Sequence, residues 1–383
     1  MNVYKFGGSS LSDAKKIIQI KKEIIDIDEC AIVLSAIGKK NDNDVKLTDL
    51  LIELCKNKTS NDIKNTIKRK ILTIAKELKV SSEIEKEVNA FLSDIEKYTD
   101  EYIISRGEYF TCKIFSAFSG VDFIDSAKFI IFEENRFSYE KTRKKVLTLR
   151  KRKFITCGFY GSNEKGDIIL FPRGGGDTTG AILASILNSK YYFNCTDVDG
   201  IYSVPPNYSD EKNTIKKLSY AQLYILSVNG LNTFSKEAIL YLINKSITLK
   251  IMNAINFDAP YTEVTDDNSS KDFYNVLVIN NIKYISFLKS EKRQDFSILY
   301  RFLENIMSDK IQIEDFSIFN DQYKIAVKNI EETEYRPYDT TPIQVIKKIT
   351  WIESDRKIEC IYLPESANKK EIKRVIKTFV KKQ

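Results

Sequence analysis

The sequence of 383 residues contains no histidine. Histidine is the side chain that most often acts as a general base near neutral pH, activates a serine or cysteine nucleophile, and ligates transition metals. Mechanisms and metal sites that require an imidazole are therefore excluded. Lysine, arginine, carboxylates and backbone groups remain as the carriers of any chemistry.

Clustered cysteines and long apolar runs are also absent. The six cysteines stand at positions 30, 55, 112, 157, 195 and 360, and no two have the CxxC spacing typical of zinc or iron–sulfur sites. We expect free thiols in a reducing cytosol, because a chain of this size needs no disulfides. No apolar run approaches the roughly 18 residues of a membrane-spanning helix, and the N-terminus shows no signal peptide. These features predict a cytoplasmic protein with no membrane partner.

Positive charge is in modest excess. The formal net charge of +7 is weak support for nucleic-acid binding and is compatible with anionic small molecules. The most basic segment, KTRKKVLTLRKRK at 141–153, has no interleaved aromatic residues and belongs to no recognised nucleic-acid module. We interpret it as a solvated helix face and expect no nucleic-acid partner.

Glycine is missing from a large part of the chain. All fourteen glycines lie between Gly7 and Gly230. Glycine is needed where a backbone turns sharply or comes close to a ligand. We therefore expect the chemistry in the first part of the chain.

Strand-like and helical segments alternate in that first part. Residues 61–118 repeat apolar side chains at helical spacing, and a helix over 181–188 follows a glycine loop. Strands are expected at 3–6, 30–35, 129–132, 154–157, 168–171 and 191–196. This alternation predicts an α/β sandwich with a largely parallel central sheet, whose active site lies at the carboxyl ends of the strands.

A polar, turn-rich segment follows the first part. We predict a catalytic domain over 1–260, a linker over 261–275 and an α+β region over 276–383. In the last region we expect strands at 276–288, 311–319, 323–328, 349–353 and 358–363, with helices at 295–307, after Pro342 and at the C-terminus. The C-terminal helix is indicated by the helical spacing of Ile372, Val375, Ile376, Phe379 and Val380.

The first candidate site is the segment KFGGSS, which starts at Lys5. It combines a lysine at the end of a strand with two glycines and a helix start. Backbone N–H groups, the helix dipole and the ammonium together favour phosphate oxygens. The segment does not match the Walker A pattern, and a structural turn is the alternative interpretation.

The second candidate is RGGGDTTG, from Arg173 to Gly180. Three consecutive glycines are costly in chain entropy, so we expect a ligand to approach this backbone closely. Arg173 can bind a carboxylate or a phosphate through two hydrogen bonds. Asp177 is either a helix cap or a group that orders phosphates and metal.

Two further segments carry weaker signals. TDVDGIY, from Thr196 to Tyr202, leaves a strand with polar groups and an aromatic ring, which suits a ribose and a base. A capped turn with a core tyrosine is the alternative. Glu108 in the segment SRGE stands near a helix start, where a glutamate is more often a dipole-matching cap than a ligand.

Taken together, these segments resemble the aspartate kinases, which have the amino-acid kinase fold. The resemblance spans roughly residues 1–255 and rests on motifs in the family's order: KFGGSS, VLSAIGKKNDNDVKLTDLL, SRGE, GFYG, RGGGDTTGAILA, TDVDGIYS and NGLNTFSKEA. It implies transfer of the γ-phosphoryl group of ATP to the side-chain carboxylate of L-aspartate, giving 4-phospho-L-aspartate for lysine, threonine and methionine synthesis. A carboxylate nucleophile has a pKa near ~4 and is already ionised at neutral pH, so this reaction needs no histidine.

The resemblance also implies roles for single residues. Lys5 is expected to stabilise the transferring phosphoryl group, and Asp177 to organise the catalytic site. The implied substrate-binding residues are Thr48, Glu108, Phe159, Arg173 and Gly176. The implied nucleotide-binding residues are Gly7, Gly8, Ser9, Gly174, Gly175, Thr196, Asp197 and Tyr202. ATP and Mg²⁺ are the implied cofactors, and we expect the nucleotide rather than the protein to hold the Mg²⁺.

The sequence departs from the family's pattern at several positions. Gly176 stands where the family's RGGSD motif has serine, which removes a hydroxyl from the substrate loop. Asn207, Asn232 and Ser235 replace an arginine, a lysine and a histidine of the family's nucleotide-side segments. Two alternatives therefore stay open: a kinase of the same fold for a different small acid, and a catalytically inactive regulatory chain.

The C-terminal region resembles the family's tandem ACT-type regulatory domains in a shortened or degenerate form. The turn that holds the family's effector normally contains glycine, but here it reads KSEKRQD over 289–295. We predict that feedback binding of lysine or threonine is lost or altered. Assembly into a homodimer or higher homo-oligomer through this region is still expected, because strand pairing needs only an edge and an apolar face.

Overall fold

The structure is a computed structural model that describes residues 1–172, 174–209, 213–228, 230–266, 274–288, 312–318, 322–328, 344–353, 357–364 and 366–380. The chain divides into two compact units. The first contains residues 1–201, 214–227 and the described residues from 232 to 266. The second contains the described residues of 202–213 and 228–231 together with those from 274 onward.

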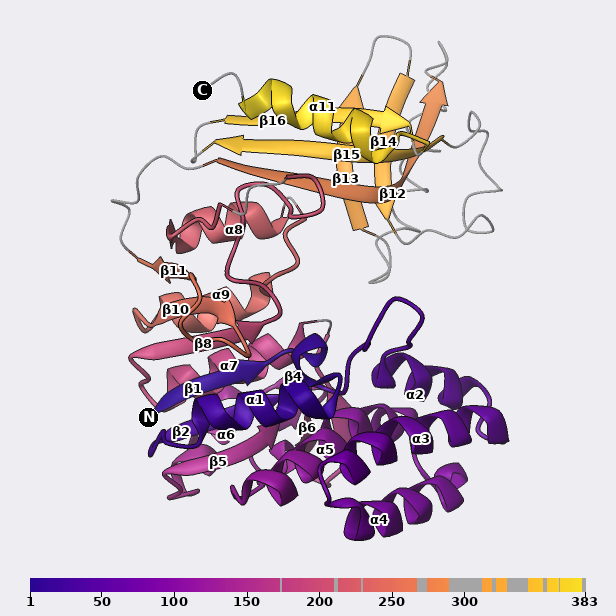
Figure 1. The fold of residues 1–383 in the computed structure, drawn as a ribbon, viewed down its shortest axis with the longest axis vertical. Coiled ribbons are helices and arrows are strands. Elements are labelled where there is room, and N and C mark those ends of the chain that lie inside the picture. The colour runs from indigo at the N-terminus through magenta and orange to yellow at the C-terminus, as the bar shows by residue number, and fades with distance from the viewer. Residues whose placement is uncertain are drawn as a thin grey trace. The chain divides into compact units, whose positions relative to one another are not determined.

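A seven-stranded sheet forms the centre of the first unit (Figure 1). Its strands, in spatial order, are β5 (Lys153–Cys157), β2 (Cys30–Leu34), β1 (Asn2–Phe6), β8 (Tyr191–Thr196), β10 (Thr248–Asn253), β11 (Thr262–Thr265) and β9 (Lys217–Ser219). The first five run parallel to one another. Every residue of β2 is buried, as expected for a parallel strand that is covered on both faces. The α/β class with a largely parallel central sheet is thus confirmed.

Helices cover both faces of this sheet. The helices described between residues 14 and 243 are α1 (Ala14–Ile24), α2 (Leu47–Lys56), α3 (Asn61–Glu77), α4 (Ser81–Ser93), α5 (Asp100–Ser119), α6 (Tyr139–Leu147), α7 (Gly175–Ile186), α8 (Tyr220–Val228) and α9 (Lys236–Ile243), with short 3₁₀ turns at η1 (Gly8–Leu11), η2 (Ile95–Lys97) and η3 (Ser126–Lys128). Helix α5 contacts β2 and β5, α7 contacts β1, β2 and β8, and α2, α3 and α4 pack on α5 or on one another. Tyr4 and Phe6 of β1 share a hydrophobic cluster with α1 and α5. Lys5 alternates to the opposite face, where α7 packs.

A smaller sheet extends the first unit beside β5. Its strands, in spatial order, are β4 (Arg136–Phe137), β3 (Ile131–Glu133), β6 (Tyr160–Asn163) and β7 (Ile168–Leu170). The turn between β5 and β6 contains Phe159, and the loop after β7 leads into α7. The smaller sheet therefore brings two segments of interest to the same edge of the unit.

Two boundaries that the sequence predicts are wrong. Helix α7 begins at Gly175 rather than at residue 181, because Gly174, with φ +83°, ends the loop and the next two glycines already form the first helical turn. Residues 262–265 form β11, antiparallel to β10, within the segment expected to be a linker. Thr262 and Val264 are buried in alternation, so β-branched residues make a short polar segment a strand.

The second unit holds a five-stranded sheet and a helix. The strands, in spatial order, are β13 (Gln312–Ile318), β14 (Gln322–Lys328), β12 (Tyr274–Leu288), β15 (Gln344–Glu353) and β16 (Lys357–Pro364), and α11 (Lys369–Val380) follows. All neighbouring strands pair antiparallel. The expected helix after Pro342 is wrong: β15 begins at Gln344, because pairing with β12 and β16 on both sides fixes an extended backbone. The expected helix at 295–307 lies outside the described residues.

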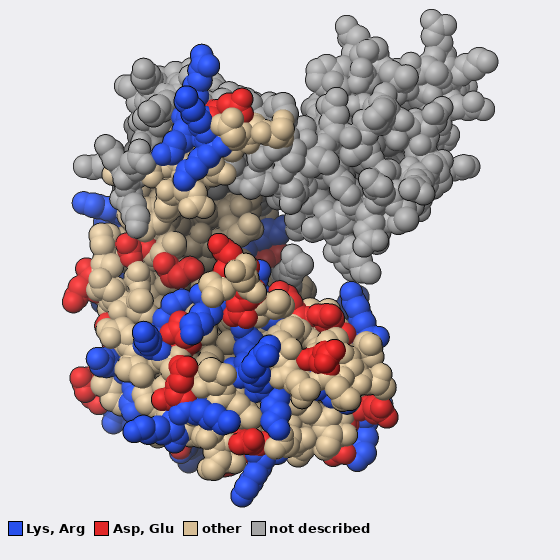
Figure 2. All heavy atoms as spheres, turned by 45° about the vertical axis from the view of Figure 1, so that its right-hand side comes forward, with Lys and Arg blue, Asp and Glu red and all other residues tan. Residues whose placement is uncertain are grey.

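Charges of both signs are mixed among the described residues on the face that Figure 2 shows. Acidic partners also accompany the basic segment 141–153. Lys141 pairs with Glu133 and Glu164, Lys151 with Asp122, and Arg152 with Glu29. This agrees with a solvated face. No helix among the described residues is long and apolar enough to cross a membrane.

Candidate active site

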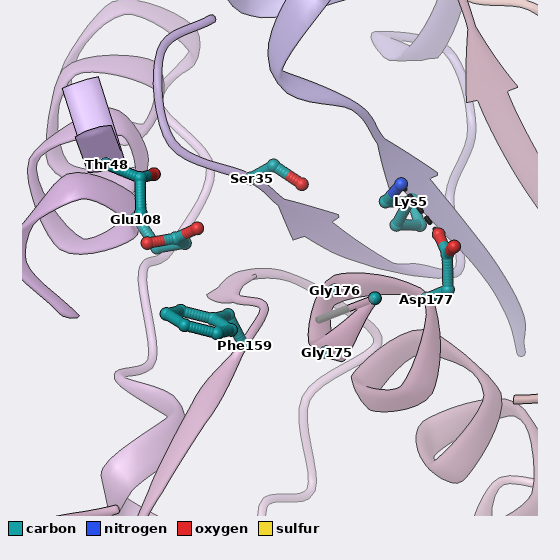
Figure 3. Close-up of a pocket in the computed structure, with 9 residues that line it drawn as sticks. Lys5, Ser35, Thr48, Glu108, Phe159, Gly175, Gly176 and Asp177 are labelled. Atoms are coloured by element: carbon teal, nitrogen blue, oxygen red, sulfur yellow. Dashed lines mark ion pairs between the residues drawn. The ribbon is translucent and has the colours of Figure 1, made fainter. Parts of the chain in front are cut away.

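A lysine and an aspartate from distant parts of the chain meet at the carboxyl end of β1 (Figure 3). The Nζ atom of Lys5 lies 2.7 Å from Oδ1 of Asp177, which stands in the first turn of α7. The side chains are only 13% and 11% exposed. The backbone N–H of Ser235 donates to Oδ2 of Asp177 at 3.0 Å. Asp177 is therefore fixed at both carboxylate oxygens.

This ion pair forms one end of a cavity of about 200 Å³. The cavity is lined by Lys5, Ser35, Thr48, Glu108, Phe159, Gly174, Gly175, Gly176 and Asp177. Drug-sized ligands usually occupy pockets of ~300–1,000 Å³. This cavity suits a smaller molecule, such as a short acid next to the end of a phosphate chain.

Glu108 lies at the other end of the cavity, between Thr48 and Phe159 (Figure 3). Its Oε1 accepts a hydrogen bond from the backbone N–H of Ala36 at 3.2 Å. Its buried Oε2 has no hydrogen-bond partner among the described residues. Burial raises the pKa of Glu108 to about 8, against the opposing effects of the Ala36 N–H and the Arg106 guanidinium. A carboxyl group with a free oxygen is thus presented where a ligand cation would neutralise it.

Arg106 is buried two residues before Glu108, on another face of α5. Its guanidinium stacks on the rings of Tyr102 and Tyr109 at 4.2 and 4.3 Å. Its Nε and Nη2 donate to the hydroxyl of Ser105. This aromatic packing holds a positive charge close enough to favour the ionised form of Glu108.

The loop that starts with Gly7 follows directly after Lys5. The N–H of Gly7 donates to the Cys195 carbonyl at the end of β8, and the Gly8 carbonyl accepts from Gly38 N–H at 2.9 Å. A side chain on Gly8 would place its Cβ 2.6 Å from the Ala36 carbonyl oxygen. Glycine is therefore required by close backbone packing. Within the described part of the chain, the N–H groups of Gly8 and Ser9 have no acceptor, and they remain free for an anion.

The triple glycine packs against three parts of the site. An added Cβ would lie 2.7 Å from Ser235 at Gly174, 2.6 Å from Phe171 at Gly175 and 3.1 Å from the Ser35 hydroxyl at Gly176. Phe159, which faces this turn, has φ +77°. That conformation costs a bulky residue about 1–3 kcal/mol, and hydrogen bonds from Phe159 N–H to Thr179 and from Phe171 N–H to the Phe159 carbonyl maintain it.

The structure gathers most of the expected site residues but not all of them. Thr196 and Asp197 lie at the end of β8, where the Thr196 hydroxyl donates to the Asp197 carboxylate at 3.1 Å, and they do not line the cavity. Tyr202 belongs to the second unit, and Arg173 lies outside the described residues. Ser35 also lines the cavity, and the sequence motifs did not single it out. Its position directly after β2 is a signal that could have found it, because sites of this fold class lie at the carboxyl ends of strands.

The sequence pattern of the amino acid kinase family matches residues 1–253, which contain every lining residue of this cavity. The chain belongs to the amino acid kinase family. Among curated relatives of this family member, Aspartokinase 3 of Bacillus subtilis is 31% identical over 297 residues, which cover 70% of this chain and 65% of that protein. The Aspartokinase of Chlamydia pneumoniae is 25% identical over 246 residues, covering 60% of this chain and 54% of that protein. The matches thus span less than two thirds of these relatives.

Solved structures resemble this kinase-family chain over almost its whole length. The aspartate kinase of Clostridium acetobutylicum has a TM-score of 0.75 at 24% identity and covers 99% of this chain and 100% of its own. The E. coli aspartokinase III in complex with aspartate and ADP has a TM-score of 0.79 at 16% identity, with 98% of both chains covered. At these identities the likeness establishes a shared fold.

Proposed function

We propose that this kinase-family member transfers the γ-phosphoryl group of ATP to the side-chain carboxylate of L-aspartate and forms 4-phospho-L-aspartate. The observation that carries the proposal is a small cavity with a Lys5–Asp177 ion pair at one end and the buried, half-satisfied carboxyl group of Glu108 at the other. Aspartokinases among the relatives support the choice of acid.

Phosphoryl transfer requires positioning and charge stabilisation rather than a base. The bond between the γ-phosphorus and the bridging oxygen of ATP breaks, and a bond to the ionised carboxylate oxygen of aspartate forms. The Lys5 ammonium and the free N–H groups of Gly8 and Ser9 stabilise the charge of the transferring group. A sequence without histidine is fully equipped for this reaction.

The substrate's amino acid end is assigned to the other side of the cavity. The free Oε2 of Glu108 accepts a hydrogen bond from the α-ammonium, with Thr48 beside it and Phe159 closing the space. Arg173 is proposed to bind the α-carboxylate, as the family resemblance implies. Recognition of both charged ends favours an α-amino acid over a simple dicarboxylic acid.

Magnesium fits the site through the nucleotide. The described residues contain no cluster of three or more histidine, cysteine or acidic side chains, and Asp177 is already engaged by Lys5 and Ser235. We therefore assign Mg²⁺ to the phosphate oxygens and water, where it supplies charge neutralisation. Thr196, Asp197 and Tyr202 are proposed to contact the nucleotide.

Residues 276–383, which make up most of the second unit, are proposed to be a shortened ACT-like region that joins copies of the chain into a homodimer or larger oligomer. Its antiparallel sheet and the buried residues Ile372 and Ile376 of α11 support an α+β module of this kind. The reaction would be the first step of the pathway from aspartate to lysine, threonine and methionine, carried out in the cytoplasm.

A hydroxylamine trap tests the activity directly. The full chain is incubated with MgATP, hydroxylamine and one acid at a time, and the hydroxamate formed from the acyl phosphate is measured. Aspartyl hydroxamate that depends on ATP is the expected product. Absence of hydroxamate from every acid would leave the inactive regulatory chain as the better description.

Gly176 favours a second candidate, a kinase for a different small acid. The family's serine hydroxyl is absent here, and the Ser35 hydroxyl lies 3.1 Å from the point where a Cβ would stand. The substrate loop therefore offers one hydrogen-bonding group fewer, which favours a substrate that does not need this contact. The same trap, run with glutamate, N-acetylglutamate and short dicarboxylic acids, separates the two candidate functions. A higher rate with one of these acids than with aspartate would favour a kinase for a different small acid.

A further inference from the structure

The glycine loop beside Lys5 has each of its first three carbonyl groups tied to a donor. The Gly7 carbonyl accepts from Ser10 N–H at 3.1 Å, and the Gly8 carbonyl accepts from Gly38 N–H at 2.9 Å. The Ser9 carbonyl accepts from the Nζ atom of Lys16 at 2.8 Å. Of these three donors, Lys16 alone donates from its side chain, because Ser10 and Gly38 donate from their backbone N–H groups.

Lys16 reaches the loop from the first turn of α1. Its backbone N–H donates to the capping carboxylate of Asp13 at 3.0 Å, which fixes the start of the helix. Its ammonium, half-buried, also donates to the Ser12 hydroxyl at 3.0 Å. The side chain is thus held at both ends and spans the loop.

Because peptide units are planar, the hydrogen bond from Lys16 also affects the orientation of the free N–H groups. The Ser9 carbonyl and the Ser10 N–H belong to one rigid plane and point in opposite directions. The Ser10 N–H in turn holds the Gly7 carbonyl, whose plane contains the Gly8 N–H. Lys16 therefore fixes the direction of the Gly8 N–H through two linked peptide planes. Gly38 does the same for the Ser9 N–H through the Gly8 carbonyl.

We propose that Lys16 is a positioning residue for the terminal phosphate of ATP: its ammonium holds the Ser9 carbonyl so that the Gly8 N–H stays directed at the phosphate. The proposal rests on the proposed function, which places a triphosphate at this loop. Without the ammonium, only the hydrogen bond from Ser10 N–H to the Gly7 carbonyl holds the Ser9–Ser10 plane. The Ser9 carbonyl loses its charged donor, and the Gly8 N–H is less firmly directed at the phosphate.

Equilibrium binding of the Mg²⁺ complex of β,γ-imido-ATP to the full chain, measured by titration calorimetry, tests this. Lys16→Met is expected to raise the Kd of the analogue roughly tenfold, the change expected for one lost charge-assisted contact. The affinity for ADP, which lacks the terminal phosphate, is expected to fall by a smaller factor. Lys16→Arg keeps the charge and the donors, and it should restore most of the affinity. Lys15→Met, at the exposed neighbouring position, is the matched control.

Turnover supplies a second readout. In the hydroxylamine trap, Lys16→Met should raise the KM for ATP and leave the KM for aspartate near that of the wild type. If the wild type forms no aspartyl hydroxamate, the proposed function fails, yet the binding comparison still tests Lys16. Unchanged affinity for the analogue in Lys16→Met, equal losses for both nucleotides, or no rescue by Lys16→Arg would each overturn the proposal. Should Lys16→Met unfold, Lys16→Gln takes its place in the same comparison.

Discussion

At the scale of single residues, the Lys5–Asp177 pair defines the chemistry of the site. The Lys5 ammonium lies 2.7 Å from the Asp177 carboxylate, and both side chains are largely removed from water. The other carboxylate oxygen of Asp177, Oδ2, accepts a hydrogen bond from the N–H of Ser235. In the proposed reaction, this pair places the Lys5 ammonium beside the transferring phosphoryl group.

Replacing Lys5 by methionine should lower kcat by about 10²–10³-fold, the usual effect of removing one preorganised group that stabilises transition-state charge. Asp177→Asn should lower kcat by a smaller factor, because the amide oxygen can still accept a hydrogen bond from the Ser235 N–H. Steady-state kinetics with ATP and aspartate measures both, and thermal unfolding shows whether the variants are folded. Full turnover by Lys5→Met would remove this residue from the mechanism.

Glu108 should make aspartate binding depend on pH. Burial raises the pKa of this carboxyl group to about 8, so it is mostly protonated at pH 7 in the free protein. The substrate's ammonium favours the ionised form, and binding at pH 7 therefore releases a proton. Affinity for aspartate should rise between pH 6 and 8. Calorimetry in buffers of different ionisation enthalpy measures the released proton, and in Glu108→Gln both the release and the pH dependence should disappear.

The same pKa shift predicts an effect on stability. A carboxyl group with a higher pKa in the folded state than its ordinary 4.5 binds protons more tightly when folded. Its stabilising contribution is complete below pH 4.5 and is lost as the pH rises through about 8. From pH 5 to 9, the unfolding free energy of the wild type should therefore fall relative to that of Glu108→Gln. A constant difference between the two proteins would contradict the raised pKa.

At the scale of elements, the start of α7 links Asp177, which we propose organises the catalytic site, to α9. Gly174 has φ +83°, and an added Cβ would lie 2.7 Å from the Cβ of Ser235, the residue before α9. The close approach lets the Ser235 N–H reach Asp177. The glycine is thus needed for backbone conformation and for helix contact at once.

Gly174→Ala should destabilise the protein in two ways. The left-handed conformation costs an alanine ~1–2 kcal/mol, and the steric conflict with Ser235 adds ~1–3 kcal/mol. Gly166→Ala is the matched control, because Gly166 has φ +91° and no atom within 4 Å of an added Cβ. Urea unfolding and turnover of both variants measure the difference. Equal stability losses, with turnover retained in Gly174→Ala, would show that the contact with Ser235 has no role.

At the scale of the whole molecule, we propose that the acid is bound in the first unit and that effectors, where the family uses them, act through residues 276–383. The cavity lies entirely in the first unit, and the glycines of that unit shape its loops. The effector-type turn at 289–295 lies outside the described residues, so its assignment rests on sequence. In the sequence, lysine, glutamate and arginine stand at positions where the family resemblance implies a glycine that admits a ligand to the backbone.

Lysine or threonine at millimolar concentration should therefore leave the rate of hydroxamate formation unchanged. The measurement is made at aspartate and ATP concentrations near their KM values, where competitive and uncompetitive inhibition both lower the rate. Strong inhibition by either amino acid would show that the effector site survives without its glycine.

Local patterns were sufficient for much of the fold. Buried runs such as CAIVL in β2 identify parallel strands, and apolar residues at helical spacing identify α3 and α11. The errors fell where tertiary pairing decides the backbone. Residues 262–265 become a strand because β10 offers an edge, and β15 extends toward Pro342 because two strands flank it.

The sequence by itself determined which groups carry the chemistry: no imidazole is present, and lysine, arginine and acidic residues stand beside glycines in a recognisable order. Only the tertiary structure decided that Lys5 and Asp177 form an ion pair, that Glu108 keeps one oxygen free, and that Lys16 holds the glycine loop. Distance and burial depend on how the strands and helices pack, and these quantities set charge, pKa and the direction of each hydrogen bond. Residue order along the chain does not contain them.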